Sequence, residues 1–124
     1  MDIKIDQSSQ MSLYEQIAFQ IRLLIADGKL KVGDNLPSVR NLSKMLAVST
    51  ISVQRAYAEL QKDGITKGVE GKGSFVADGV NKSSLKDGLL SQVEETAKQT
   101  IQVAKQNGIK LTELQDLIHI LWEE

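Results

Sequence analysis

The stretch LPSVRNLSKMLAVSTISVQRAYAELQKDG at residues 36–64, followed by EGKGSFV at residues 70–76, decides the fold. Ser38 follows Pro37 and is placed to cap a short helix, because a serine hydroxyl can accept from a free amide of the first turn. That helix breaks at residues 47–49, where Ser49 is placed to cap the next one. Two helices joined by so tight a turn form a helix-turn-helix. The first helix is predicted to be short, because Leu42, Met45 and Leu46 are followed directly by the break. The buried face of the second is predicted to be Val53, Ala56, Tyr57 and Leu60, and Gly64 closes it.

The residues on either side of this motif predict a third helix and a hairpin. Ser12 and Glu15 have the spacing of a capping box, and Gly28 is placed to end that helix in the left-handed conformation. Residues 65–69 and 74–76 are typical of short strands, joined by a tip whose glycines allow the positive φ of a tight turn. Residues 1–77 are therefore predicted to form a winged helix-turn-helix domain, mainly α with a small β-hairpin. The buried face of the preceding helix is predicted to be Leu13, Ile17, Ile21, Leu24 and Ile25.

Residues 78–124 predict a polar linker and two further helices. The first begins near Leu85 and runs to Gly108, and the second begins at Thr112, with Gln115 as the partner of its cap. Two helices enclose too little core to hide their apolar stripes, so we expect this segment to form a two-fold homodimer interface. His119 is interpreted as a packing or interface residue. The predicted interface residues are Leu89, Val93, Ala97, Ile101, Leu114, Ile118, Leu121 and Trp122.

Composition excludes several classes of function. The chain has no cysteine and one histidine without arranged carboxylates, so we expect no metal site and no cofactor. No nucleophile, acid/base pair or Ser/His/Asp set is recognisable, and we do not expect an enzyme. The sequence also lacks a secretory signal pattern and a run of apolar residues that could span a bilayer, which predicts a cytoplasmic protein without a membrane partner.

The charge of the chain is compatible with DNA as a partner. Its net charge is −1, but residues 1–77 carry ten Lys and Arg against eight Asp and Glu, or +2. Residues 78–124 carry five against eight, or −3. Because phosphate binding depends on where the cations lie and not on their sum, this asymmetry permits a nucleic-acid partner without proving one.

The N-terminal turn of the second helix of the motif is the predicted reading surface. Ser49, Thr50 and Ser52 place hydroxyl groups there, beside helix amides that favour a phosphate. Gln54 lies one turn further on, and its amide can make two hydrogen bonds to a base edge, most commonly that of adenine. The alternative interpretation is that these are capping residues and a solvated glutamine.

The words quoted above, together with SLYEQIAFQIRLLIADGKLKVGDN at residues 12–35, resemble the DNA-binding domain of the GntR family of bacterial transcription regulators. The resemblance covers residues 12–77 and implies a winged helix that binds double-stranded DNA. The words SVR and VQRAY, with the short tail, are similar to the YtrA-like subfamily, in which two C-terminal helices dimerise. Thr50 and Gln54 stand where many relatives have arginine, so guanine contacts cannot be assumed at either position. Ala47 stands where many relatives have glycine.

Three basic residues complete the predicted site, and the resemblance supports the first of them, Arg40. The LPSxR motif contains Ser38 and Arg40, and in relatives its arginine contacts DNA; otherwise Arg40 would pair with a carboxylate on the surface. Arg55 either reaches a phosphate or lies across the domain surface. At the wing tip, Lys72 is placed to face phosphates, and Gly73 lets the backbone approach a minor groove.

Two hypotheses follow from the sequence. The first is a homodimeric repressor that reads a palindromic operator, and the subfamily resemblance implies transport operons as its context. The second uses the winged helix as a protein-interaction module without specific DNA binding. The operator, the regulated genes, the sign of regulation and any small-molecule effector are left open by the residues.

Overall fold

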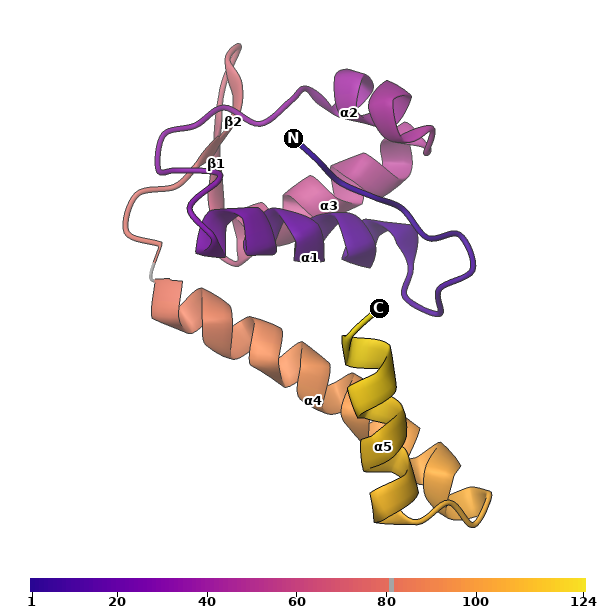
Figure 1. The fold of residues 1–124 in the computed structure, drawn as a ribbon. Helices are drawn as coiled ribbons and strands as arrows, with labels where there is room; N and C mark the ends of the chain where they lie inside the picture. Colours follow the sequence, from indigo (N-terminus) through magenta and orange to yellow (C-terminus); the bar gives the residue numbers. More distant parts are fainter. Residues whose placement is uncertain (81) are drawn as a thin grey trace. The chain divides into compact units, whose positions relative to one another are not determined.

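The computed structural model describes residues 1–80 and 82–124, and the side chains of residues 82–84 and 86–88 are left aside. Helices dominate, with one antiparallel hairpin, as the sequence predicts (Figure 1). The elements are α1 (Leu13–Ala26), α2 (Val39–Leu46), α3 (Thr50–Lys62), β1 (Thr66–Val69), β2 (Gly73–Val76), α4 (Lys82–Gln106) and α5 (Leu111–Trp122).

The chain divides into two compact units, Met1–Leu89 and Leu90–Glu124. We expected the division after residue 77, at the end of the hairpin. It falls later because Leu85 of α4 belongs to the core of the first unit, with only 5% of its surface exposed. Helix α4 also begins at Lys82, so residues 82–84, expected in a linker, are helical. The winged helix therefore includes the first turns of α4.

The core of the first unit lies mainly between α1 and α3. Ile17 and Ile21 of α1 and Leu60 of α3 are fully buried. The predicted buried face of α3 is confirmed, whereas Leu13 and Leu24 of α1 are only half-buried. Outside the helices, Ile3 of the N-terminal segment also joins this core.

Helix α2 has only eight residues and buries a narrow stripe. Leu42 is fully buried, whereas Met45 is 58% exposed. Ser43 is also buried, and its hydroxyl donates to the Val48 carbonyl across the turn.

The helix caps agree with the sequence in the helix-turn-helix and differ elsewhere. The Ser38 hydroxyl accepts from the Asn41 amide at 3.1 Å, and the Ser49 hydroxyl accepts from the Ser52 amide at 3.2 Å. Ser12 stands at the N-cap of α1, but its hydroxyl donates to the Glu15 carboxylate at 2.7 Å and makes no bond to the backbone.

Helix α5 begins one residue earlier than predicted. Its N-cap is Lys110, whose amide donates to the Glu113 carboxylate at 3.1 Å. The predicted cap with Thr112 and Gln115 is therefore wrong. An ionised carboxylate is a stronger acceptor for a free helix amide than a neutral amide side chain, and Glu113 has the spacing that reaches back to residue 110.

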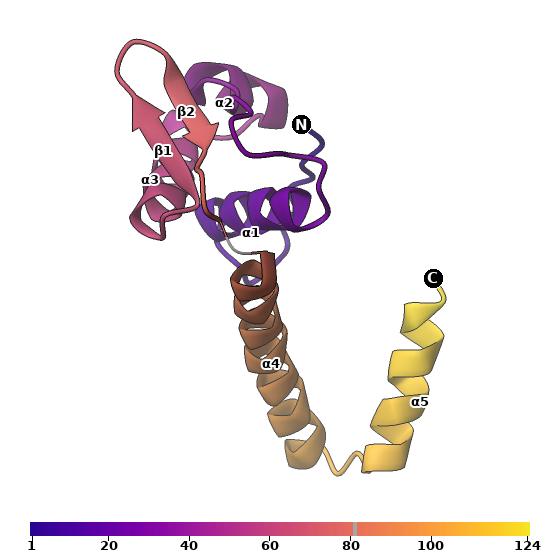
Figure 2. The ribbon, with the colours of Figure 1, turned by 90° about the vertical axis from the view of Figure 1, so that its left-hand side faces the viewer.

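The second unit is a pair of helices with a small core. Ala104 of α4 and Leu114 of α5 are buried near the turn that joins them, and beyond that turn the helices diverge (Figure 2). Of the residues predicted to face a second copy, Leu89 and Leu114 are each 9% exposed. The other predicted interface residues are exposed, with Val93, Ile101, Ile118, Leu121 and Trp122 at least 43% exposed, and Ala97 also exposed.

The hairpin is anchored to the segment that precedes α2. Strands β1 and β2 pair antiparallel, with Thr66 opposite Val76. On the other side of β2, the Leu36 amide donates to the Ser74 carbonyl at 2.8 Å and the Val76 amide donates to the Asp34 carbonyl at 2.9 Å. The wing is thus hydrogen-bonded directly to the chain that leads into α2.

The turn of the helix-turn-helix contains a strained residue. Ala47 has φ 55° and ψ 44°, and it is the only non-glycine residue with positive φ in the described part of the chain. A Cβ atom in this left-handed region crowds the following carbonyl, at a cost of about 1–2 kcal/mol. The conformation persists because Val48 and Ser43 hold the turn from both sides.

We expect Ala47→Gly to raise the free energy of unfolding by about 0.5–1 kcal/mol, the strain relieved less the extra chain entropy of glycine. Ala58→Gly, at an exposed position inside α3, is the matched control and should lower it by about 1 kcal/mol. Urea titration followed by circular dichroism, at one fixed protein concentration, measures both. A loss of stability in Ala47→Gly would show that the turn is not strained.

Candidate nucleic-acid interface

Helix α3 has one buried face and one free face. Val53, Ala56 and Leu60 are fully buried, whereas Thr50 and Gln54 are exposed. The hydroxyls of Ser49 and Ser52 lie 3.2 Å apart at the helix start. The N-terminal turn of α3 therefore offers hydroxyls and a glutamine amide to a ligand, as the sequence predicts, on a helix whose opposite side fixes its position.

One residue of this turn escaped the sequence analysis. Ile51 is 72% exposed, more than any other large aliphatic residue of the described part of α1, α2 and α3. The periodicity of α3 does contain the signal, because Ile51 lies outside the stripe that includes Val53 and Leu60. An isoleucine beside Thr50 and Gln54 makes the free face partly apolar.

A buried hydrogen bond ties α3 to the chain before α2. The Tyr57 hydroxyl donates to the Pro37 carbonyl at 2.7 Å. Burial raises the pKa of the Tyr57 phenol well above its ordinary value, so the hydroxyl remains protonated and able to donate at physiological pH. This bond sets the start of α2, and with it Ser38 and Arg40, at a fixed place beside α3.

The two arginines of the predicted site have different surroundings. Arg40 is exposed, and its guanidinium makes no ion pair or hydrogen bond with any described residue. The Arg55 guanidinium carbon lies 3.8 Å from the centre of the Tyr14 ring, in a cation–π contact that joins α3 to α1. Arg40 therefore has no ion-pair partner among the described residues, whereas Arg55 has a partner on α1.

The wing tip presents one lysine on a glycine turn. Gly71 and Gly73 have positive φ, 75° and 100°, and the Lys72 amide donates to the Val69 carbonyl at 2.9 Å. Lys72 is exposed. Along the same hairpin, Lys67 lies 3.7 Å from the Asp78 carboxylate. The tip therefore carries a lysine with no ion-pair partner among the described residues, at a place where the backbone itself can approach a groove.

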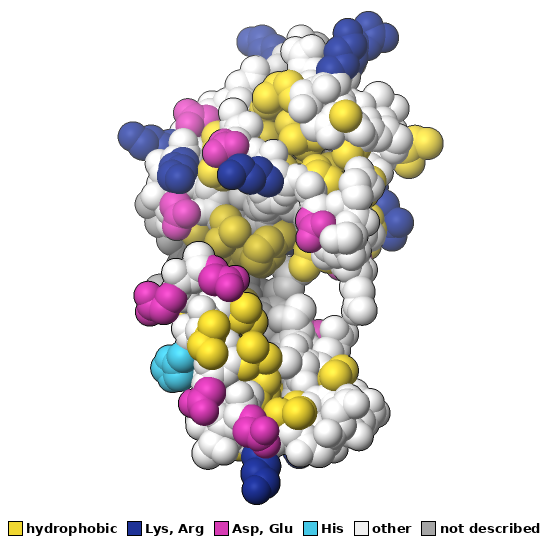
Figure 3. Space-filling model, turned by 45° about the vertical axis from the view of Figure 1, so that its right-hand side comes forward, with side chains coloured by type: hydrophobic (Ala, Val, Ile, Leu, Met, Phe, Trp, Pro, Cys, Tyr) yellow, Lys and Arg dark blue, Asp and Glu magenta, His cyan; other side chains and the backbone are white. Residues whose placement is uncertain are grey.

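The charged side chains of the first unit gather at its surface. On the face drawn in Figure 3, several Lys and Arg side chains lie on the upper, winged-helix part. An ion pair between Arg22 and Asp63 joins α1 to the end of α3 and is part of the scaffold. Among the described residues, no group of three or more His, Cys, Asp and Glu could hold a metal ion. No helix of the described chain is long and apolar enough to cross a membrane.

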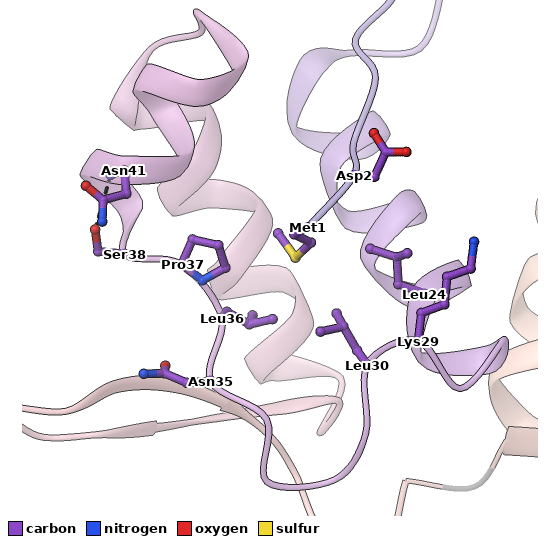
Figure 4. Close-up of a pocket in the computed structure, with 10 residues that line it drawn as sticks. All are labelled: Met1, Asp2, Leu24, Lys29, Leu30, Asn35, Leu36, Pro37, Ser38 and Asn41. Carbon is purple, nitrogen blue, oxygen red and sulfur yellow. Dashed lines mark hydrogen bonds between the residues drawn. The ribbon is translucent and has the colours of Figure 1, made fainter.

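A hollow of about 670 Å³ lies between the N-terminal segment, the end of α1 and the chain before α2 (Figure 4). Met1 lies in its middle, among the aliphatic side chains of Leu24, Leu30 and Leu36. The polar residues of its lining are all exposed to solvent: Asp2, Lys29, Asn35, Ser38 and Asn41. A ligand would find no desolvated polar group to orient it, so the geometry assigns this hollow no effector.

A helix-turn-helix with a free second helix, followed by a glycine-tipped hairpin, defines the winged-helix class of DNA-binding proteins. Comparison with known proteins agrees. The model of the gntR family of bacterial regulatory proteins matches residues 13–76. The chain is 35% identical to the HTH-type transcriptional repressor YtrA of Bacillus subtilis, over 94% of this chain and 88% of that protein.

Solved structures show the same relationship. A GntR-family transcription factor, YtrA from Sulfolobus acidocaldarius, superimposes with a TM-score of 0.60 at 39% identity, over 74% of this chain and 97% of that one. The DNA-binding domain of AraR in complex with operator ORE1 superimposes with a TM-score of 0.53 at 25% identity, over 62% of this chain and 94% of that one. The chain belongs to the gntR family of bacterial regulatory proteins. It is a transcription regulator with a DNA-binding domain, and this family consists of regulators and not of enzymes.

The different surroundings of the arginines predict different defects. Arg40→Ala should weaken binding to all DNA sequences and reduce the log-log salt slope by about 1 per subunit bound. Arg55→Ala should leave the slope unchanged and lower the free energy of unfolding by about 0.5–1 kcal/mol, since it removes the contact with Tyr14. Fluorescence anisotropy at several salt concentrations and urea titration measure the two effects. A salt slope that falls as much in Arg55→Ala as in Arg40→Ala would show that Arg55 contacts a phosphate.

Proposed function

We propose that the protein is a homodimeric repressor that binds a palindromic operator. The observation that carries this proposal is the free face of α3 on a gntR-family winged helix. Each copy would insert the N-terminal turn of α3 into a major groove, where Thr50 and Gln54 meet base edges. Two copies related by a two-fold axis would read two half-sites of opposite orientation.

The surrounding groups have positioning roles in this proposal. Ser38 and Arg40 at the start of α2 contact the backbone beside the recognition helix, and Ser49 and Ser52 meet a phosphate at the amide end of α3. Lys72 and Gly73 bring the wing to a flanking groove. These contacts orient the protein on the duplex and carry no sequence information of their own.

The second unit supports the homodimer. Large apolar side chains are exposed along both of its helices, and Figure 3 shows a continuous row of them on one face, bordered by acidic side chains and the histidine. A soluble protein rarely leaves so much apolar surface in contact with water unless a partner covers it. The exposed set comprises Leu90, Val93, Ile101, Val103, Ile109, Leu111, Leu117, Ile118, Ile120, Leu121 and Trp122.

A second copy of the chain is the partner we propose for this face. A two-fold interface brings the same patch from both chains together, so an apolar row needs no other complementary surface. Dimerisation then raises operator affinity, because the second half-site is met at a high effective concentration. The likeness to YtrA-type repressors makes a transport operon the first place to look for the operator.

Specific DNA binding should weaken steeply as salt rises. With about three to five phosphate contacts per subunit, the logarithm of the binding constant should fall with the logarithm of salt concentration with a slope of about −5 to −9. Nuclease footprinting on the region upstream of the gene identifies the operator, and anisotropy measures the slope. A flat salt response without a footprint would favour the protein-interaction module instead.

The dimer interface can be tested in the full chain by one added charge. Leu121→Asp should raise the dimer dissociation constant by more than about 100-fold, because a two-fold interface loses two buried leucines of at least about 1.5 kcal/mol each. Thr112→Asp adds the same charge to the polar side of α5 and is the control. Sedimentation equilibrium measures both. A Leu121→Asp protein that dimerises as well as the parent would remove α5 from the interface.

A further inference from the structure

Ile51 is the one large apolar side chain that α3 turns away from the core. It is 72% exposed, whereas Val53 and Leu60 of the same helix are fully buried. An exposed isoleucine contributes nothing to the packing of the first unit and forgoes about 1.5–3 kcal/mol that burial would give. Its place in the fold therefore has no structural explanation, and the side chain is available to a ligand.

The neighbours of Ile51 define what that ligand can be. Gln54 lies three residues later and Ala58 seven residues later, so all three occupy one face of α3, and all three are exposed. The Ser49 and Ser52 hydroxyls lie 3.2 Å apart at the cap, whereas Thr50 and Gln54 are exposed. The start of α3 thus presents one exposed aliphatic side chain, Ile51, beside the Thr50 hydroxyl and the Gln54 amide.

We propose that Ile51 is a specificity-determining residue that packs on the C5-methyl group of a thymine in the operator. The inference rests on the proposed function, in which this turn enters the major groove. Thymine is the only base that presents a methyl group there, and aliphatic side chains recognise it by contact. Ile51 brings no hydrogen-bonding group, so it distinguishes thymine from cytosine by shape and burial alone.

The spacing of Ile51 and Gln54 predicts which base pairs they read. Three residues of α-helix advance by about 4.5 Å, and one base-pair step advances by about 3.4 Å. The two side chains therefore meet neighbouring base pairs. With Gln54 on an adenine, each half-site should contain a thymine contacted by Ile51 directly beside that A·T pair.

The methyl group can be removed from the DNA without any other change. Once an operator has been selected, each thymine in turn is replaced by deoxyuridine, symmetrically in both half-sites, and binding to the full-length protein is measured by anisotropy. One thymine position should show a loss of about fifteenfold, roughly fourfold per half-site, because each substitution exposes one methyl contact. Ile51→Ala should be insensitive to uracil at that position.

Two controls assign the effect to Ile51. Gln54→Ala should bind less tightly to the neighbouring adenine but keep the uracil sensitivity of the parent. Val32→Ala shortens another exposed aliphatic side chain, 53% exposed in the turn before α2, and should behave as the parent does throughout. Uracil sensitivity retained in Ile51→Ala, or no sensitive thymine in the parent, overturns the inference. Failure to select any specific operator would instead overturn the proposed function.

Discussion

The apolar seam between α1 and α3 is the interaction on which the first unit depends. Ile17, Ile21 and Ile25 of α1 meet the buried stripe of α3, and full burial of each such side chain stabilises the fold by about 1.5–3 kcal/mol. Because an α-helix is rigid, burying one side of α3 determines which side faces outward. The recognition surface is therefore a consequence of core packing. Thr50, Ile51 and Gln54 face outward because Val53, Ala56 and Leu60 are buried on the opposite side.

Hydrogen bonds extend this fixed geometry from the core to the start of α2 and to the wing. The Tyr57 hydroxyl holds the Pro37 carbonyl, and the backbone at residues 34–36 pairs with β2. A buried phenol whose pKa is raised cannot ionise near neutrality, so the hydrogen bond from the Tyr57 hydroxyl to the Pro37 carbonyl does not depend on pH in the physiological range. Through these bonds, the start of α2 and the wing both have defined positions beside α3. A groove-reading protein needs that rigidity, since base contacts tolerate little error in placement.

The second unit, unlike the first, leaves most of its apolar surface exposed. Its helices bury Ala104 and Leu114 and leave most of their large apolar side chains in water, which suits association better than independent folding. Residues 90–124 carry three lysines against six Asp and Glu, a net charge of −3. The overall charge of −1 conceals this difference in charge between the two units.

The sequence by itself determined the winged helix, the caps at Ser38 and Ser49, the buried stripe of α3 and the glycine-tipped wing, because each depends on residues within one or two helical turns of each other. It also determined the family, through several sequence motifs that occur in a fixed order. Only the tertiary structure decided that Leu85 joins the first core, that Met45 is exposed, and that Arg55 lies on Tyr14 while Arg40 has no ion-pair partner among the described residues. These facts depend on which elements meet across the chain. Local spacing cannot specify such contacts, because the same helical face can be covered by a distant segment or left to solvent.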